Sequence, residues 1–175
     1  WENIGAGHED KGQIAIPDDI DAVSGAAMAI KREVLEKIGK IDENYEVYGE
    51  DVDICLRAKL AGYHILYVPT AVFMHKRSST IGEFSPRKLY YLFRNRLRLI
   101  CKFMPVPKMI FCLLFHTCFL PLFYLVRYVA KGGHRYTPYD YIKSIARSIM
   151  NFYARLREHI RARYEITQFL RLRIF

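Results

Sequence analysis

The second half of this sequence has very few acidic residues. Residues 76–175 contain 4 Asp and Glu against 20 Lys and Arg, a net charge of +16. Residues 1–75 contain 14 acids against 7 bases, a net charge of −7, so the total of +9 hides two parts of opposite sign. No single functional label therefore fits the whole chain. A basic half of this kind is typical of proteins that bind nucleic acid, anionic lipid or an anionic substrate.

Cysteine is also scarce, and no two cysteines form a C-x-x-C pair. The spacing of Cys55, Cys101, Cys112 and Cys118 favours a reduced, cytosolic setting over a disulfide framework. The first residues are polar and acidic with no apolar segment, so no signal peptide is expected in them. The chain begins at Trp1 and not at Met, which suggests a piece of a longer protein.

Charged residues are absent from the 18 positions of 109–126. This length is at the lower limit for crossing a bilayer, and His116 and Pro121 weaken a simple spanning helix. Because Lys108 precedes the segment and Arg127 follows it, an interfacial or re-entrant segment is favoured over a single span, which stays an alternative. Arginines elsewhere in the basic half alternate with apolar residues at helical spacing, which favours a membrane surface or lipid-linked substrate over nucleic acid.

Apolar periodicity divides the chain into two predicted parts. Residues 1–86 are expected to form an α/β layered unit, and residues 87–175 a basic, amphipathic helical region that includes the apolar segment. The expected elements, in order, are strand 21–30, helix 31–39, helix 50–62, a strand bent at Pro69 over 63–75, helix 87–104, and one or two helices within 138–175.

The residues richest in potential chemistry are 48–53, with the sequence YGEDVD. Glu50, Asp51 and Asp53 follow a glycine at a predicted helix start, and such closely spaced like charges require a partner. A carboxylate here suits a general base that takes a proton from an attacking hydroxyl. The alternative is that the acids only cap the helix and face solvent. His75 ends the predicted strand, either as a satisfied strand-end histidine or as part of an oxygen-rich Mg²⁺ or Mn²⁺ site.

These motifs together resemble a known family. The run from Ser24 to His75 reads SGA, a Glu- and Arg-rich helix, YGEDVDICLR, GY, PTA and a final His, and the likeness continues to Arg94-Asn95. In this order the motifs resemble the C-terminal half of the catalytic domain of family 2 glycosyltransferases, with the rhamnosyltransferase-like bacterial enzymes most similar. The resemblance covers roughly residues 10–100.

The resemblance implies a GT-A fold, which is a Rossmann-like α/β sandwich, followed here by C-terminal helices. It implies an inverting transfer from a nucleotide-sugar with a divalent cation, Mg²⁺ or Mn²⁺. Asp51 falls at the family's catalytic base, and His75 at a metal ligand of some relatives. Glu50, Asp53, Gly25 and Arg94 are expected at the donor or acceptor site, and Arg57 is expected to hold a carboxylate.

The family's first strand, nucleotide-binding loop and D-x-D segment would precede Trp1, so we expect the chain to be inactive alone. We further expect a lipid-linked or other glycan acceptor, an anionic membrane partner and no nucleic acid. The expected location is the cytoplasmic face of the inner membrane, in the synthesis of cell-surface polysaccharide. The alternatives are a non-catalytic membrane-surface scaffold derived from such a domain, and a nucleic-acid-binding protein that uses the basic half.

Overall fold

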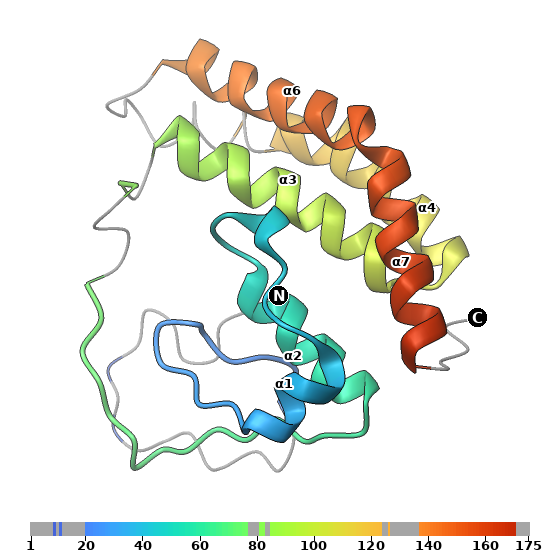
Figure 1. Ribbon diagram of the computed structural model, residues 1–175. Coiled ribbons are helices and arrows are strands. Elements are labelled where there is room, and N and C mark those ends of the chain that lie inside the picture. Colours follow the sequence, from blue (N-terminus) through green and yellow to red (C-terminus); the bar gives the residue numbers. More distant parts are fainter. Residues whose placement is uncertain are drawn as a thin grey trace.

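The computed structural model describes residues 9, 11, 20–76, 81–82, 85–123, 126 and 137–170. Helix α3 lies between α6 and α7 on one side and the layer of α1 and α2 on the other (Figure 1). The elements are α1 (Arg32–Ile38), the 3-10 helix η1 (Glu43–Tyr45), α2 (Glu50–Leu60), α3 (Pro86–Phe103), α4 (Val106–Leu114), the π-helix η2 (Phe115–Phe119), α6 (Pro138–Ala154) and α7 (Leu156–Leu170).

The predicted α/β sandwich is wrong, because the described ranges contain helices and connecting segments but no β-strand. Residues 63–68 do alternate between partly buried and exposed, as they would on a pleated strand. Among the described residues, one backbone hydrogen bond joins this segment to the residue just before the other expected strand, from the Ile20 N–H to the Ile65 carbonyl at 3.2 Å. A strand requires a ladder of such bonds with a neighbour. The side-chain alternation is therefore present without the pairing that makes a sheet.

The helix predictions are confirmed, with ends shifted by a few residues. Helix α3 begins where the Ser85 hydroxyl accepts the Lys88 N–H at 3.1 Å, and Pro86 occupies its first turn. Helix α6 begins with a capping box between Thr137 and Asp140. The predicted bend at Pro69 is also present, as a turn that the structure places at residues 69–70.

Three apolar clusters pack the described helices together, one between α1 and α2 and two between α3 and α6. The cluster between α1 and α2 contains Val34, Ile38, Ile54, Cys55 and Ala58. A second cluster joins α3 to α6 through Leu97, Cys101 and the fully buried Phe152. Full burial of a large apolar side chain such as Leu, Ile or Phe stabilises the fold by roughly 1.5–3 kcal/mol. The second cluster fixes α3 from behind, so the opposite face of α3 is presented to the loop before α2.

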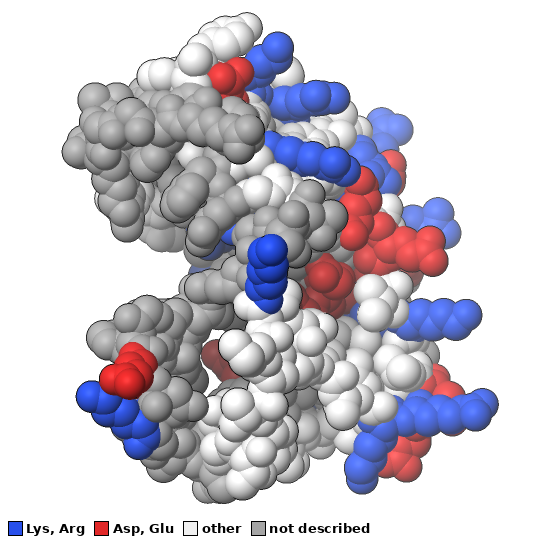
Figure 2. Space-filling view, turned by 90° about the vertical axis from the view of Figure 1, so that its left-hand side faces the viewer, with Lys and Arg blue, Asp and Glu red and all other residues white. Residues whose placement is uncertain are grey.

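Ion pairs between the acidic and the basic half fill the space between these clusters. Four of them join acids at 42–53 to bases at 94–102, namely Glu46–Arg94, Asp42–Arg98, Asp42–Lys102 and Asp53–Lys102. Part of the excess positive charge of residues 76–175 therefore neutralises acidic residues of the first half inside the protein. On the face drawn in Figure 2, basic side chains stand beside acidic ones and do not form an unbroken basic patch.

The apolar segment forms the exposed edge of the helical part. Val106–Phe123 is an 18-residue helical stretch that by length and composition alone could cross a membrane, and none of it is buried. Three phenylalanines stack along it, with ring centroids 6.5 Å apart for Phe111 and Phe115 and 6.1 Å apart for Phe115 and Phe119. An apolar helical face without a protein neighbour among the described residues needs another apolar environment.

Candidate active site

The predicted base, Asp51, lies in the first turn of α2 and is partly buried. Its Oδ2 accepts the Gly25 N–H at 3.0 Å, and its Oδ1 accepts the Val52 N–H at 2.8 Å. The two bonds fix the plane of the carboxylate, and each oxygen keeps a second lone pair for another donor. The structure therefore joins Asp51 to the predicted SGA segment, 26 residues earlier in the chain.

Gly25 lies close to Asp51, and a side chain would not fit easily between them. A Cβ atom at this position would meet the Asp51 Cβ at 3.3 Å and its Oδ2 at 3.7 Å. The family resemblance led us to expect Gly25 at the donor or acceptor site. In the structure, the close approach is made by the carboxylate of Asp51 itself. Gly25 thereby acts on the site through the position of that carboxylate.

Glu50 precedes Asp51 and is also partly buried. Its Oε2 atom is buried, with no hydrogen-bond partner among the described residues. Burial raises the pKa of the Glu50 carboxyl, and the negative charge of Asp51 raises it further. This buried carboxyl oxygen beside Asp51 therefore keeps an unused capacity to accept a hydrogen bond.

Asp53 belongs to the protein core and not to the surface of this site. It is completely buried, with Oδ1 accepting from the Tyr45 hydroxyl at 3.0 Å and from Lys102 Nζ at 2.5 Å. Its Oδ2 accepts from Arg57 Nε at 2.7 Å, so the prediction that Arg57 holds a carboxylate is confirmed. We predicted a contact between Asp53 and substrate, but the oxygens of Asp53 are shielded by these partners. They tie α2 to η1 and α3.

Arg94 is likewise directed into the protein. It is buried, and its guanidinium donates to Glu46 Oε1 at 2.6 Å and to the Asn44 and Tyr45 carbonyls at 3.0 and 2.8 Å. Its Nε donates to Asn95 Oδ1 at 2.9 Å. All three nitrogens are used inside the protein. The family resemblance led us to expect Arg94 at the donor or acceptor site, but this arrangement supports a packing role inside the protein.

His75 is exposed, and no hydrogen bond or ion pair joins it to Asp51 within the described part of the chain. The described residues also contain no group of three or more His, Cys, Asp or Glu side chains arranged to hold a metal ion. The side chains of the described residues therefore do not by themselves form a complete cation site. The roles of His75 and of Mg²⁺ or Mn²⁺ therefore stay predictions.

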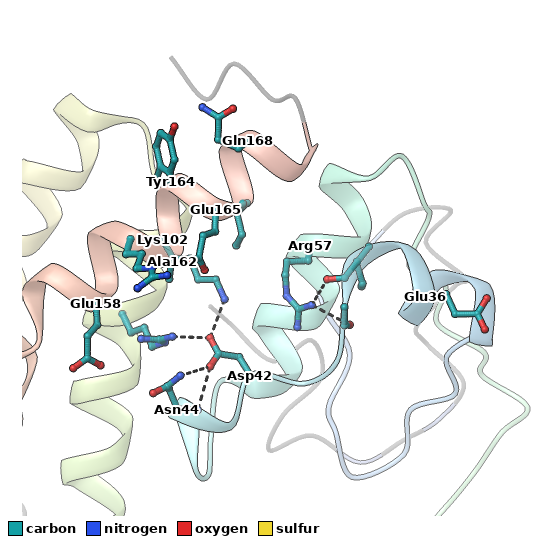
Figure 3. Close-up of a pocket in the computed structure, with 15 residues that line it drawn as sticks. Glu36, Asp42, Asn44, Arg57, Lys102, Glu158, Ala162, Tyr164, Glu165 and Gln168 are labelled. Atoms are coloured by element: carbon teal, nitrogen blue, oxygen red, sulfur yellow. Dashed lines mark hydrogen bonds and ion pairs between the residues drawn. The ribbon is translucent and has the colours of Figure 1, made fainter.

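The sequence reasoning missed a polar cluster on the inner face of α3. Asp42 Oδ2 accepts from Arg98 at 2.6 Å and from Lys102 at 3.1 Å, as Figure 3 shows. Burial opposes ionisation of Asp42, but Arg98 and Lys102 together hold the pKa of its carboxyl below the ordinary value. The signal was available, because Arg94, Arg98 and Lys102 recur at four-residue spacing and share one helix face.

The same cluster continues onto α7 through a buried histidine. Arg98 donates to His159 Nδ1 at 2.7 Å, and the His159 ring stacks on Phe152 with centroids 4.7 Å apart. Burial and the neighbouring Arg98 charge lower the pKa of His159 to about 4. The ring is therefore neutral, with its hydrogen on Nε2, because Nδ1 must accept from Arg98.

A cavity of about 930 Å³ lies beside this cluster, between α7 and the α1–η1 region (Figure 3). Its walls include Asp42, Arg98 and Lys102 together with Glu158 and Glu165 of α7. Neither Asp51 nor Glu50 lines it. Cationic and anionic side chains are balanced around it, so its electrostatics do not select a ligand charge. The candidate site is therefore the first turn of α2, and not the large cavity.

A comparison with protein families places this geometry in context. The family model described as "Glycosyltransferase like family 2" matches residues 13–102, which is just over half of the chain. The match includes Gly25, Glu50 and Asp51, and it ends inside α3 at Lys102. The predicted resemblance over residues 10–100 is confirmed. No solved structure matches the chain significantly.

Curated relatives match shorter stretches. An N-acetylglucosaminyl-diphospho-decaprenol L-rhamnosyltransferase of Mycobacterium tuberculosis is 35% identical over 61 residues, which is 35% of this chain and 20% of that protein. Rhamnosyltransferase WbbL of Escherichia coli is 34% identical over 56 residues, 32% of this chain and 21% of that protein. O-antigen biosynthesis protein RfbC of Myxococcus xanthus is 31% identical over 72 residues, 41% of this chain and 6% of that protein. The matched segment thus spans about a fifth or less of each relative.

Proposed function

This chain belongs to glycosyltransferase-like family 2, and on that premise we propose that it supplies the catalytic base and acceptor side of an inverting sugar transfer. The family match over residues 13–102 is the observation that carries the proposal, because membership implies a sugar donor and an acceptor. The names of both rhamnosyltransferase relatives support rhamnose as the transferred sugar, and the name of the Mycobacterium tuberculosis relative supports a lipid-diphosphate-linked sugar as acceptor. A nucleotide-sugar as donor is carried over from the family resemblance.

In the proposed reaction, Asp51 takes the proton of an acceptor hydroxyl. The hydroxyl oxygen then forms a bond to the anomeric carbon, while the bond from that carbon to the nucleoside diphosphate breaks and its electrons leave with the diphosphate. The Gly25 and Val52 N–H groups orient the carboxylate toward the acceptor. General-base catalysis of this kind contributes about 10²–10⁴ in rate. The free oxygen of Glu50 is proposed to bind a second acceptor hydroxyl.

The test is the Asp51→Asn substitution in the complete polypeptide that carries this sequence. The amide keeps the size of the side chain but loses the basic oxygen, so turnover with an activated rhamnose and a polyprenyl-diphosphate-linked acceptor should fall at least about 10²-fold. Donor binding, measured by calorimetry, should be unchanged. The control is Glu36→Gln, because the Glu36 side chain is 64% exposed on α1. Turnover that survives Asp51→Asn would refute the base and favour the alternative of a non-catalytic scaffold.

We propose further that the helical part binds an anionic membrane at the cytoplasmic face of the inner membrane. The support is the unburied apolar stretch Val106–Phe123, which begins beside the exposed Lys108. Lipid would cover the apolar face and attract the adjacent cation. A lipid-linked acceptor would then meet the protein at the surface in which its tail is embedded.

Vesicle flotation tests this second proposal. Replacement of Phe111, Phe115 and Phe119 by Ser should abolish flotation with vesicles containing a third of phosphatidylglycerol. The matched control replaces three exposed apolar residues outside the segment, Leu66, Val72 and Met74, by Ser. Equal loss in both triple variants, or no loss in either, would contradict a membrane role for this helix.

A further inference from the structure

The loop that leads into Glu50 and Asp51 has an unusual backbone. Glu46, Tyr48 and Gly49 all have positive φ angles, of 60°, 67° and 94°. L-residues rarely adopt such angles, and two of the three carry side chains. A loop of this shape persists only where surrounding contacts over-determine it. Because Gly49 is the N-cap of α2, the shape of this loop sets where the first turn of α2 begins.

One side chain of α3, that of Asn95, forms hydrogen bonds to the backbone of the loop 44–49. Asn95 is 2% exposed, and its amide nitrogen donates to the carbonyls of Tyr45, Val47 and Tyr48 at 2.9, 2.8 and 2.6 Å. An amide group has two hydrogens, so three acceptors share them, and the three carbonyls must converge on one point. A Cβ atom at Gly49 would lie 3.5 Å from the Asn95 Cβ, which shows how closely α3 approaches this turn.

Arg94 also forms hydrogen bonds to this loop, and it orients the side chain of Asn95. The Arg94 Nε donates to Asn95 Oδ1, which leaves the amide nitrogen of Asn95 directed toward the loop carbonyls. The guanidinium also binds the Glu46 carboxylate and the Asn44 and Tyr45 carbonyls. The three loop partners of Arg94, namely Glu46, Asn44 and Tyr45, all lie within residues 44–49, the six residues directly before Glu50.

We infer that Arg94 and Asn95 are positioning residues for the catalytic carboxylate, and that they act through the loop 44–49. The inference rests on the proposed function of Asp51. In the chain of contacts, α6 and α7 support α3, Asn95 of α3 fixes the loop, and the loop fixes the start of α2. Asp51 then reaches the Gly25 N–H at 3.0 Å. The helical part thereby has a role in the chemistry besides any contact with lipid.

The experiment measures kcat and the donor KM of Asn95→Ala, Asn95→Ser and Leu97→Ala in the complete polypeptide, well below each melting temperature. Asn95→Ala removes the donor to all three carbonyls, and we expect kcat per folded molecule to fall about 10–100-fold with donor KM changed less than twofold. Asn95→Ser restores one hydroxyl donor and should recover part of kcat. Leu97→Ala is the matched control, because Leu97 is fully buried on the same helix and lies in the apolar cluster with Phe152.

Leu97→Ala should lower the melting temperature at least as far as Asn95→Ala while it leaves kcat within twofold. Equal losses of kcat in these two variants would show that Asn95 acts only through stability and would overturn the inference. An unchanged kcat in Asn95→Ala would overturn it as well. These outcomes differ from failure of the proposed function, which is read from Asp51→Asn alone. If Asn95→Ala does not fold, Arg94→Lys tests the same loop, with loss of kcat at constant KM expected.

Discussion

The buried histidine of α7 gives the sharpest physical prediction for this fold. The His159 ring accepts a hydrogen bond from Arg98 and stacks on Phe152, and its pKa is lowered to about 4 from the ordinary value of 6.5. Protonation would place a second hydrogen between Nδ1 and the guanidinium, where two donors would face each other. Three other charged groups act on the ring: Arg155 and Arg94 lower its pKa as Arg98 does, and Glu158 raises it.

The sign of the pH effect follows from the two states. Below pH 6.5 the unfolded chain binds a proton at this histidine, whereas the folded chain does not until about pH 4. Folding stability is therefore lost progressively as pH falls from about 7 to 4. A gap of about 2.5 units corresponds to about 3 kcal/mol when complete. About 2 kcal/mol of it should be lost between pH 7 and pH 5.

Urea unfolding of wild type and His159→Gln, followed by circular dichroism at pH 7 and pH 5, measures this loss. The glutamine can still accept from Arg98 but does not titrate, so the variant should lose about 2 kcal/mol less than wild type over this interval. The difference between the two proteins cancels contributions from the remaining histidines. Asp42 has a lowered pKa, so its contribution is lost mainly below pH 5. Equal losses in wild type and variant would refute the neutral, buried state of this ring.

Two further substitutions follow from the same contacts. Lys102→Ala should lower the free energy of unfolding by about 3–5 kcal/mol in urea titrations, because it removes a cation from the fully buried Asp53 and the partly buried Asp42. The matched change at an exposed lysine, Lys143→Ala, should alter it by less than about 0.5 kcal/mol. An effect below 1 kcal/mol at Lys102 would contradict the buried network. Gly25→Ala should lower turnover while it shifts the melting temperature only slightly, because the added Cβ meets Asp51 at 3.3 Å in an exposed segment. Unchanged turnover would show that Asp51 does not depend on this contact.

The helices were predictable because their signals are local. Gly39 and Gly62 follow the ends of α1 and α2, Ser85-Pro86 begins α3, and Pro105 follows its end. The motif order around Glu50 and Asp51 likewise indicated the family, which the match over residues 13–102 confirms. Capping groups and ordered motifs are properties of short stretches of chain, so a sequence can show them without its neighbours in space.

The strand predictions were wrong for the opposite reason, because strand formation depends on residues that are distant in the sequence. The sequence of 63–75 has the apolar alternation of a strand, and exposure in the structure follows it over 63–68. Whether an alternating segment becomes a strand depends on a second backbone at its edge, which no local pattern reports. The described residues supply one hydrogen bond there, so the segment is extended chain.

Sequence alone determined which residues carry potential chemistry and that the two halves have opposite charge. Only the tertiary structure separated the three acids at the start of α2. It leaves Asp51 with the Gly25 N–H and Glu50 with an unpaired oxygen, while Asp53 is enclosed by Tyr45, Arg57 and Lys102. The tertiary structure also brings acidic residues of the first half into ion pairs with basic residues of the second half, up to 60 positions apart in the sequence. Spacing along the chain places acids on a helix, but the burial and partners of each depend on which distant segments pack against that helix.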